Sequence, residues 1–403
     1  MVRPTPRTVR PARAVAGTTR EASRRAPDWR GMRLNEMERF IRDEFENEAS
    51  PEKRARQVWS HLYADRTLAD AFDSTFSAAF VDAAETSGAT FDAGLRLRTP
   101  IAQAADGTVK LLMDRGGDSG VPGSSAIETV LIPADTDGRR PRITVCVSSQ
   151  VGCAMGCKFC FTGTMGLEAN LATAEIVHQV VVAKRVAAEL FPNAPVKSLV
   201  FMGMGEPLQN TDAVLQAIDI LSTPGKGIAH LSERKMTVST VGIVPEMRRL
   251  AKESKAQLAV SLHATTEEQR TSIIPQNRIH SLGDILACLE ELFPKGRTEG
   301  VHGRHVLIEY VMLAGVNDTQ EDARRLATLL APLECKVNLI VFNTFDGSPF
   351  VPAERAQVRD FRETLVAAGF VCTVRDSRGD DTMAACGQLG SGKRAKKAQA
   401  LVG

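Results

Sequence analysis

Strand-like apolar runs alternate with helical stretches along the chain from about residue 142 onward. Near-continuous apolar runs of this kind are typical of a parallel sheet covered by helices. The candidate strands are RITVCVS, KSLVFMG, KMTVST, AQLAVSL, RHVLIEYVML and KVNLIVF, with a last strand near FVCTVRD. The helical stretches between them are 171–190, 210–222, 245–253, 280–293, 318–331 and 353–368. Six strand–helix units are too few for a closed eight-stranded barrel, so the pattern predicts an open, partial (β/α)6 barrel over residues 136–390.

The region before the barrel has a different pattern. Residues 34–92 contain helical spacings, and PEKRARQVWSHLY places a proline at a helix start, so we expect a small N-terminal helical accessory domain. GTVKLLM and AIETVLIP are β-type runs separated by the Gly/Ser-rich RGGDSGVPGSS. These runs predict a β-hairpin linker over residues 93–135.

The two ends of the chain are basic. Residues 1–30 contain eight Arg, no Lys and only two acids, Glu21 and Asp28. This composition resembles an organellar transit peptide, which would direct the protein to a plastid or another organelle; the alternative is a disordered basic arm on a cytoplasmic protein. The tail 391–403 is also basic, although the formal net charge of the whole chain is only +2. No apolar run is long enough to span a bilayer, so we expect no membrane partner.

Three of the eight cysteines follow the first barrel strand within CAMGCKFC: Cys153, Cys157 and Cys160. Clustered cysteines outside a small secreted protein favour metal binding over disulfides. A structural zinc site needs four ligands, and only His178 offers itself as a fourth. An iron–sulfur cubane held by three thiolates would instead leave one iron open to an outside ligand. Ligand count favours the cubane, with zinc and simple packing as the alternatives.

Other polar features also lie where predicted strands end, which is where barrels of this type carry their chemistry. They are the GMGEP stretch at 203–207, Ser239, His263 and Asn343. Glycine allows the backbone to approach a ligand closely, and a carboxylate such as that of Glu206 can pair with an ammonium group. Each feature also has an ordinary structural explanation, such as a Gly-rich turn or a hydrogen-bonded core histidine.

The Cys-x-x-x-Cys-x-x-Cys spacing resembles the signature of the radical S-adenosylmethionine (SAM) superfamily. The resemblance implies a partial (β/α)6 barrel and a 4Fe–4S cluster on Cys153, Cys157 and Cys160, with SAM bound to the fourth iron. It also implies that Gly205 and Glu206 contact the methionine part of SAM. The motifs SSQVGCAMGCKFC, GMGEPLQN, VSTVGIVP, VSLHA, IEYVMLAGVND and RGDDTMAACGQLG follow in this order, and the resemblance extends over residues 34–390. Together they resemble the RlmN/Cfr family, which methylates an adenine of large-subunit (23S) ribosomal RNA.

The family resemblance also implies roles for single residues. Cys386 would carry a methyl group from one SAM, a second SAM would supply the radical, and Cys146 would help to remove a ring proton and resolve the protein–RNA adduct by forming a disulfide. Glu128 would be a proton acceptor. The SAM-contacting positions would be Ser239, Ser261, Leu262, His263 and Asn343.

The expected activity is methylation of adenine C2 in ribosomal RNA, with transfer RNA as a further substrate. Reduced flavodoxin or ferredoxin would supply electrons to a monomeric enzyme. The alternatives are C8 methylation of the same adenine, a radical SAM reaction without methyl transfer, and an RNA-binding module with a structural metal.

Overall fold

The computed structural model describes residues 28–45, 48–63, 76–88, 94–115, 126–134, 140–224, 231–296, 304–375 and 377–390. The Arg-rich residues 1–27 and the tail 391–403 lie outside these ranges. The transit-peptide interpretation and the basic tail therefore stay predictions. Among the described helices, none is both long and apolar enough to cross a membrane.

The predicted strands are present and form the parallel part of one large sheet. Neighbouring strands in this part pair in parallel. In order across the sheet they are β5 (Arg142–Val147), β8 (Val196–Phe201), β9 (Met236–Thr240), β10 (Gln257–Ser261), β11 (Val306–Met312), β12 (Cys335–Val341) and β13 (Val371–Arg375). The open (β/α)6 arrangement is confirmed, with β13 as one further parallel strand.

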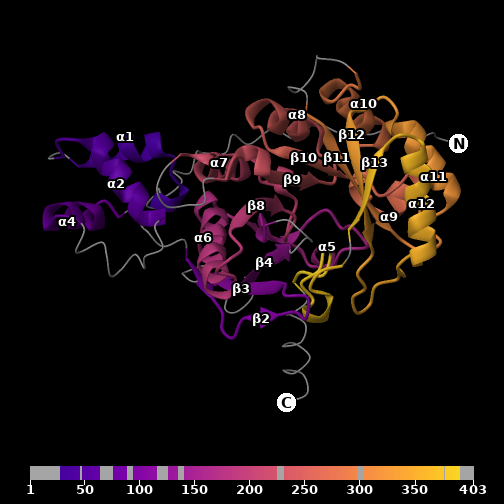
Figure 1. Ribbon diagram of the computed structural model, residues 1–403. Helices are drawn as coiled ribbons and strands as arrows, with labels where there is room; N and C mark the ends of the chain where they lie inside the picture. Colours follow the sequence, from indigo (N-terminus) through magenta and orange to yellow (C-terminus); the bar gives the residue numbers. More distant parts are fainter. Residues whose placement is uncertain are drawn as a thin grey trace, which may run out of the picture.

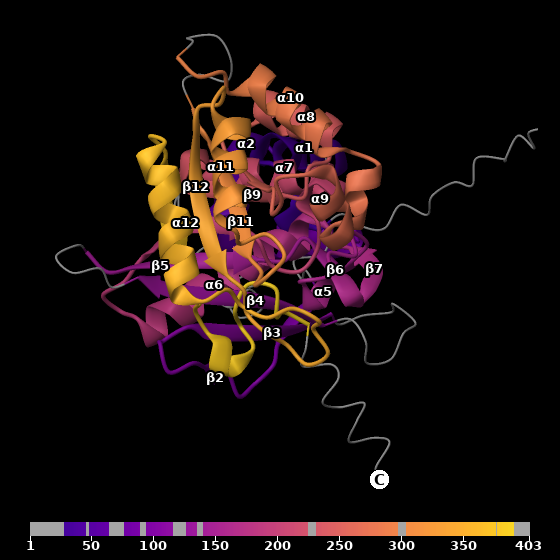
Figure 2. The same ribbon diagram turned by 90° about the vertical axis from the view of Figure 1, so that its right-hand side faces the viewer.

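Helices follow these strands on the outer side of the sheet (Figures 1 and 2). The six predicted helices are α6 (Thr173–Leu190), α7 (Thr211–Ser222), α8 (Val244–Glu253), α10 (Leu282–Leu292), α11 (Gln320–Leu330) and α12 (Arg355–Ala367). Short elements escaped prediction because they span too few residues to show a period. These are the hairpin β6 (Gln150–Cys153) and β7 (Gly166–Asn170), α5 (Phe161–Thr164), α9 (Glu267–Ile273), η2 (Pro207–Gln209), η3 (Glu233–Lys235), η4 (Pro275–Arg278) and η5 (Asp380–Thr382).

The predicted hairpin belongs to the same sheet as the barrel strands. Its strands β3 (Val109–Arg115) and β4 (Ala126–Ala134) pair antiparallel, and the short strands β1 (Leu95–Leu97) and β2 (Ala102–Gln103) both pair with β3. In addition, β4 pairs antiparallel with β5, which places Val130 opposite Cys146. The expected linker therefore extends the barrel sheet and supplies a wall beside Cys146.

The N-terminal helices lie together at one end of the molecule, beyond α6 and α7 (Figure 1). They are η1 (Trp29–Gly31), α1 (Leu34–Glu44), α2 (Pro51–Tyr63) and α4 (Ala78–Thr86). Aromatic rings form their core: the ring of Trp29 lies 5.3 Å from that of Phe40, and the ring of Phe45 lies 5.0 Å from that of Phe80. The Gln216 side chain on α7 donates to the Gly31 carbonyl at 2.6 Å, which joins this unit to the barrel.

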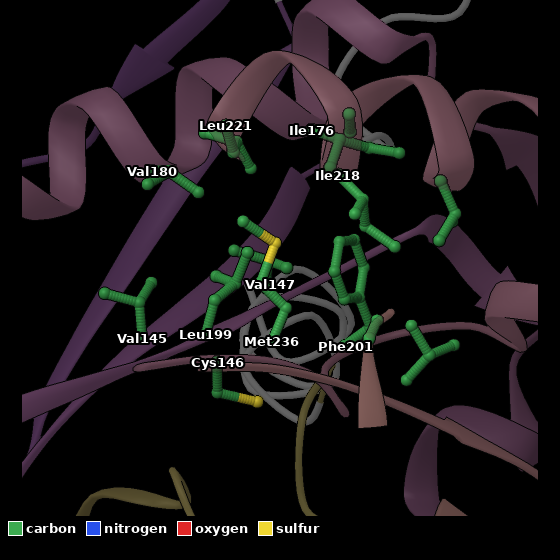
Figure 3. Packing of buried hydrophobic residues seen from close by; sticks show 14 of the residues in the cluster. Val145, Cys146, Val147, Ile176, Val180, Leu199, Phe201, Ile218, Leu221 and Met236 are labelled. Carbon is green, nitrogen blue, oxygen red and sulfur yellow. The ribbon is translucent and has the colours of Figure 1, made fainter. Parts of the chain in front are cut away.

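The alternation of side chains along β5 separates the core from the site. Val145 and Val147 point toward α6 and α7, whereas Cys146 points to the other face of the strand (Figure 3). Successive residues of a strand face opposite sides, so an apolar run in this position has both a helix-facing and an inward-facing set. Cys146 belongs to the inward set.

The helix-facing layer should carry much of the stability of the barrel. Leu199 is fully buried beside Val145, its partner across the β5–β8 pairing. We expect Leu199→Ala to lower the free energy of unfolding by about 2–5 kcal/mol, because it leaves a cavity in a close-packed layer. Denaturant unfolding monitored by circular dichroism measures this. Lys197→Ala, exposed on the same strand, should change the value by less than about 0.5 kcal/mol; similar losses for the two variants would contradict this account of the layer.

Candidate active site

One cavity opens at the carboxyl ends of the barrel strands and gathers most of the predicted site residues. It encloses about 950 Å³, its open mouth included. The predicted residues that line it are Cys153, Cys157, Cys160, Gly205, Glu206, Ser239, Ser261, His263, Asn343 and Cys386. Residues more than 200 positions apart in the sequence therefore share one space.

The three clustered cysteines enter this cavity from a tight loop. Cys153 ends β6, and the Cys160 amide donates to the Cys157 carbonyl at 3.1 Å. Gly163 allows the turn to close, since a Cβ there would lie 2.8 Å from the Cys157 carbonyl oxygen. Burial raises the pKa of the Cys153 thiol to about 12, and the nearby Cys160 thiolate adds to this shift. A positive metal centre would reverse the balance, because metal ligation requires the thiolate.

The donor set fits an iron–sulfur cluster better than a single ion. Across the described ranges, no three His, Cys, Asp or Glu side chains converge as the ligands of one metal ion. His178, considered as a fourth zinc ligand, instead contacts Arg30 through its Nδ1 atom. Three thiols spaced around one cavity suit a cubane, in which each thiolate takes a separate iron and the fourth iron takes a ligand from outside the chain.

The GMGEP stretch forms a close-fitting wall next to the cysteines. Gly205 has a φ of +102°, and a Cβ on it would lie 2.5 Å from the Cβ of Gln150. The Glu206 carboxylate accepts hydrogen bonds from the amides of Leu208 and Val241, both at 2.9 Å. Burial raises the pKa of Glu206 to about 7, although these amides oppose the shift. Only glycine fits at position 205, and the next residue, Glu206, places a buried carboxylate in the same wall. This carboxylate can pair with an ammonium group of a ligand.

His263 presents a neutral imidazole to the cavity. Its Nδ1 accepts a hydrogen bond from the Val311 amide at 3.0 Å, which places the ring proton on Nε2. Burial lowers the pKa of His263 to about 3, and the Arg270 charge acts in the same direction. His263 also has a φ of +57°, which turns its side chain inward at the end of β10. It can act as a hydrogen-bond donor over the ordinary pH range.

The side chain of Leu262 lies outside the cavity that His263 lines. Its side chain is fully buried in the main core and does not line the cavity, whereas its neighbours Ser261 and His263 do. The predicted contact of Leu262 with SAM stays a prediction; its side chain does not line the cavity, because the alternation along the strand points it toward the helices.

Cys146 lies in a second, smaller cavity, and Cys386 borders both cavities. The second cavity lies between β4 and β5 on one side and β12 and β13 on the other, where the barrel remains open. Glu128 lies outside both cavities; it is buried, and its Oε2 is 3.8 Å from Nζ of Lys110. The two candidate redox cysteines are thus brought together, whereas the candidate proton acceptor lines neither cavity.

The loop that carries Cys386 is hydrogen-bonded to the cysteine loop. The Phe161 amide donates to the Gly387 carbonyl at 2.7 Å, and the Thr162 hydroxyl donates to the Leu389 carbonyl at 2.7 Å. The Asn343 side chain donates to the Cys386 carbonyl at 3.0 Å. These bonds fix Cys386 beside the place where the cluster would bind.

Three charged residues of the site escaped prediction. Arg270 is fully buried and donates to the carbonyls of Leu262 at 3.0 Å and Val241 at 2.5 Å. Glu309 lines the first cavity and Arg375 lines the second. A sequence signal existed for Glu309 and Arg375, because each is a charged residue within an apolar strand and burying a charge is costly unless it is paired. Arg270 gave no such signal.

Comparison with known proteins identifies similar chains. The family model for the radical SAM superfamily matches residues 147–327. The chain is 40% identical over 363 residues to the dual-specificity RNA methyltransferase RlmN of Pelobacter propionicus, covering 90% of this chain and 95% of that protein. It is 44% identical over 342 residues to RlmN of Anaeromyxobacter dehalogenans, covering 83% and 85%. A crystal structure of a radical SAM methyltransferase from Sphaerobacter thermophilus matches with a TM-score of 0.77 and 38% identity, covering 90% of this chain and 99% of that chain.

The cysteine loop yields a prediction about iron content. We expect anaerobically purified protein to contain about four irons per chain, and Cys157→Ala to lose most of them, because one iron loses its thiolate. Iron and sulfide assays measure this. Cys335→Ala, half-buried at the start of β12 and outside both cavities, should retain the iron. Full iron content in the Cys157 variant would rule out the proposed ligand set.

The neutral His263 yields a prediction about pH. Its folded pKa is depressed, so the unfolded chain binds the proton first and the free energy of unfolding falls as the pH drops below about 6.5. We expect this contribution to reach roughly 1 kcal/mol at a pH one unit lower. Unfolding of the wild type and His263→Gln between pH 5.5 and 7.5 measures it. The variant should show the shallower loss, and parallel curves would contradict the depressed pKa.

Proposed function

The chain belongs to the RlmN family of radical SAM methyltransferases, and we propose that it transfers a methyl group through Cys386 to C2 of an adenine in large-subunit (23S) ribosomal RNA and in transfer RNA. The observation that carries this proposal is the position of Cys386. Its thiol borders the cavity lined by the three cluster cysteines and also the cavity that holds Cys146. In the proposed reaction Cys386 takes a methyl group in the first cavity, and a second thiol in the other cavity later resolves the adduct on Cys386. Cys386 must therefore be accessible from both cavities.

The first cavity provides the groups that a bound cluster and SAM require. Cys153, Cys157 and Cys160 would hold the cluster, and Glu206 would pair with the SAM ammonium group. When bound, the cluster and two molecules of SAM supply one methyl group and, after one-electron reduction, one carbon-centred radical. The largely apolar walls of the cavity disfavour bulk water, which protects reactive species.

Cys386 then carries the reacting carbon. Its sulfur takes the methyl group, and after hydrogen abstraction from that methyl the carbon bonds to adenine C2. The C2 hydrogen then leaves as a proton, which Cys146 would help to remove, and the unpaired electron of the adduct would return to the cluster. The protein and the RNA are now joined through one sulfur–carbon bond. The Asn343 side chain and the Phe161 amide hold the backbone of this loop, so the sulfur stays at the boundary of the two cavities.

Cys146 releases the product. Its thiolate attacks the sulfur of Cys386, a sulfur–sulfur bond forms, and the bond from Cys386 sulfur to the bridging carbon breaks. The electron pair of that bond goes to the carbon, which takes one proton and becomes the methyl group. The two sulfurs are oxidised to a disulfide, and a dithiol reductant restores both thiols.

The RNA must present an unstacked base, because a ring carbon inside a duplex cannot reach a reacting group within a protein cavity. Single-stranded or remodelled RNA fits this need better than an intact A-form duplex. Reduced flavodoxin or ferredoxin would supply the electrons, and the enzyme would act as a monomer. C2 is the position expected for the RlmN family to which the chain belongs.

The carrier role of Cys386 gives the test of this function. We expect Cys386→Ala to abolish RNA methylation while it still cleaves SAM to 5′-deoxyadenosine under reduction, because the variant keeps the first cavity and loses the carrier. Mass spectrometry of the RNA and of the nucleoside products measures both results.

Two comparisons complete this test. Cys335→Ala, which removes a thiol outside both cavities, should methylate RNA at the wild-type level. Ribosomal RNA from cells with and without the protein shows which adenine, and which ring position, is modified. Normal methylation by the Cys386 variant would overturn the carrier mechanism.

A further inference from the structure

Arg375 is a charged residue in the second cavity for which the proposed reaction has no role so far. It ends β13 and lies opposite Ile340 in the β12–β13 pairing. Its Nη1 lies 3.8 Å from the sulfur of Met202, which follows β8, so the side chain reaches across the open side of the barrel. No carboxylate of the described residues lies within 4.0 Å of this guanidinium.

The titratable neighbours of Arg375 include both cysteines of the proposed reaction. Burial disfavours its charge, but Cys386, Glu309 and Cys146 outweigh burial and raise the pKa of Arg375 above its ordinary value. A half-buried guanidinium that lacks a close carboxylate and faces two thiols can stabilise negative charge on either sulfur.

Stabilisation of the thiolate by a nearby positive charge matters more for Cys146 than for Cys386. Cys146 is only 6% exposed, and burial raises the pKa of its thiol to about 12. Charge on Cys386 adds to that shift, and Arg375 is the largest influence in the opposite direction. An attack on the sulfur of Cys386 requires the thiolate, because a thiol is a poor nucleophile.

The other titratable groups around Cys146 cannot take this role. Those on the packed elements are Glu309 on β11, Glu128 on β4 beside Lys110, and Arg378 and Cys386 on the loop after β13. The carboxylates would oppose a thiolate, and Lys110 is directed to Glu128 and to the Met383 carbonyl. Arg378 is exposed at the cavity wall.

We propose that Arg375 is a positioning residue that increases the fraction of Cys146 present as thiolate for the release of methylated RNA. The inference rests on the proposed function. It adds a residue that acts through Cys146, while methyl loading of Cys386 proceeds in the other cavity. Lysine would keep the charge but not the planar shape, so charge and shape can be separated by substitution.

The first experiment measures the thiol itself and needs no RNA. Anaerobically purified holoenzyme, reduced and free of SAM, is alkylated with iodoacetamide between pH 7 and pH 10, and peptide mass spectrometry reports the rate at Cys146. Each unit by which the pKa rises lowers the rate at a given pH roughly tenfold. We expect at least this loss in Arg375→Met and in Arg375→Gln, and a much smaller one in Arg375→Lys.

A matched control lies on the outer side of the barrel. The Arg362 side chain donates to the Cys372 carbonyl at 3.1 Å, and its charge opposes the effect of burial on the pKa of Cys372. Arg362→Met should therefore leave alkylation of Cys146 unchanged. Iron content and circular dichroism of each variant show whether the fold and the cluster are retained. A wild-type alkylation profile at Cys146 in a folded Arg375→Met or Arg375→Gln variant would overturn the proposal.

The second experiment measures product release. With RNA, SAM and a reductant, Arg375→Met should form 5′-deoxyadenosine and accumulate a covalent protein–RNA species on denaturing gels, as expected for Cys146→Ala. Arg375→Lys should release methylated RNA faster than Arg375→Met does. Release by the Met variant at the wild-type rate would contradict the role of Arg375. Failure of the wild type to methylate any RNA would overturn the proposed function instead, and the alkylation result would still decide what Arg375 does to Cys146.

Discussion

Parallel pairing of the barrel strands is the constraint on which the site depends, because it brings the carboxyl ends of distant segments to one edge. Ser239 pairs opposite Ala259, and Ser261 pairs opposite Glu309, so polar groups of β9, β10 and β11 lie on the same inward face. A shift of any strand by one residue would turn its polar groups toward the helices and its apolar groups into the cavity. The buried helix-facing layer around Leu199 therefore fixes the register of the site as well as the fold.

Buried polar groups then hold the strand ends in place. Arg270 is fully buried, yet its guanidinium donates to carbonyls at the ends of β9 and β10 and, at 2.9 Å, to Asn277. Burying a charge is costly unless its hydrogen-bond donors find acceptors. Here the guanidinium N–H groups donate to backbone carbonyls that the hydrogen bonds of the sheet leave free. The same carbonyls belong to the segment that carries Ser261 and His263. The cofactor wall thus owes its shape to a residue that does not itself line the cavity.

The open side of the barrel provides the space for the second cavity. A closed barrel would pair β13 with the first strand and leave no space for Cys386 beside Cys146. The opening is covered instead by the loop after β13, which hydrogen-bonds to the cysteine loop through Phe161 and Thr162. The cysteine loop and the loop that carries Cys386, the proposed methyl carrier, are therefore joined by hydrogen bonds, and Arg375 lines the cavity that Cys386 shares with Cys146.

The sequence by itself determined the alternation of strands and helices, the three-cysteine loop and the ordered motifs, because each of these is encoded by residues close together in the chain. It also indicated Ser239, His263 and Asn343 as residues at strand ends. Only the tertiary structure decided that Leu262 faces the core, that the hairpin continues the barrel sheet, and that Glu128 lies outside both cavities. The hydrogen bonds of Arg270 and the position of Arg375 beside Cys146 and Cys386 likewise became visible only there. These features depend on register and on contacts between segments far apart in sequence, and local periodicity carries no information about which distant strand a side chain will face.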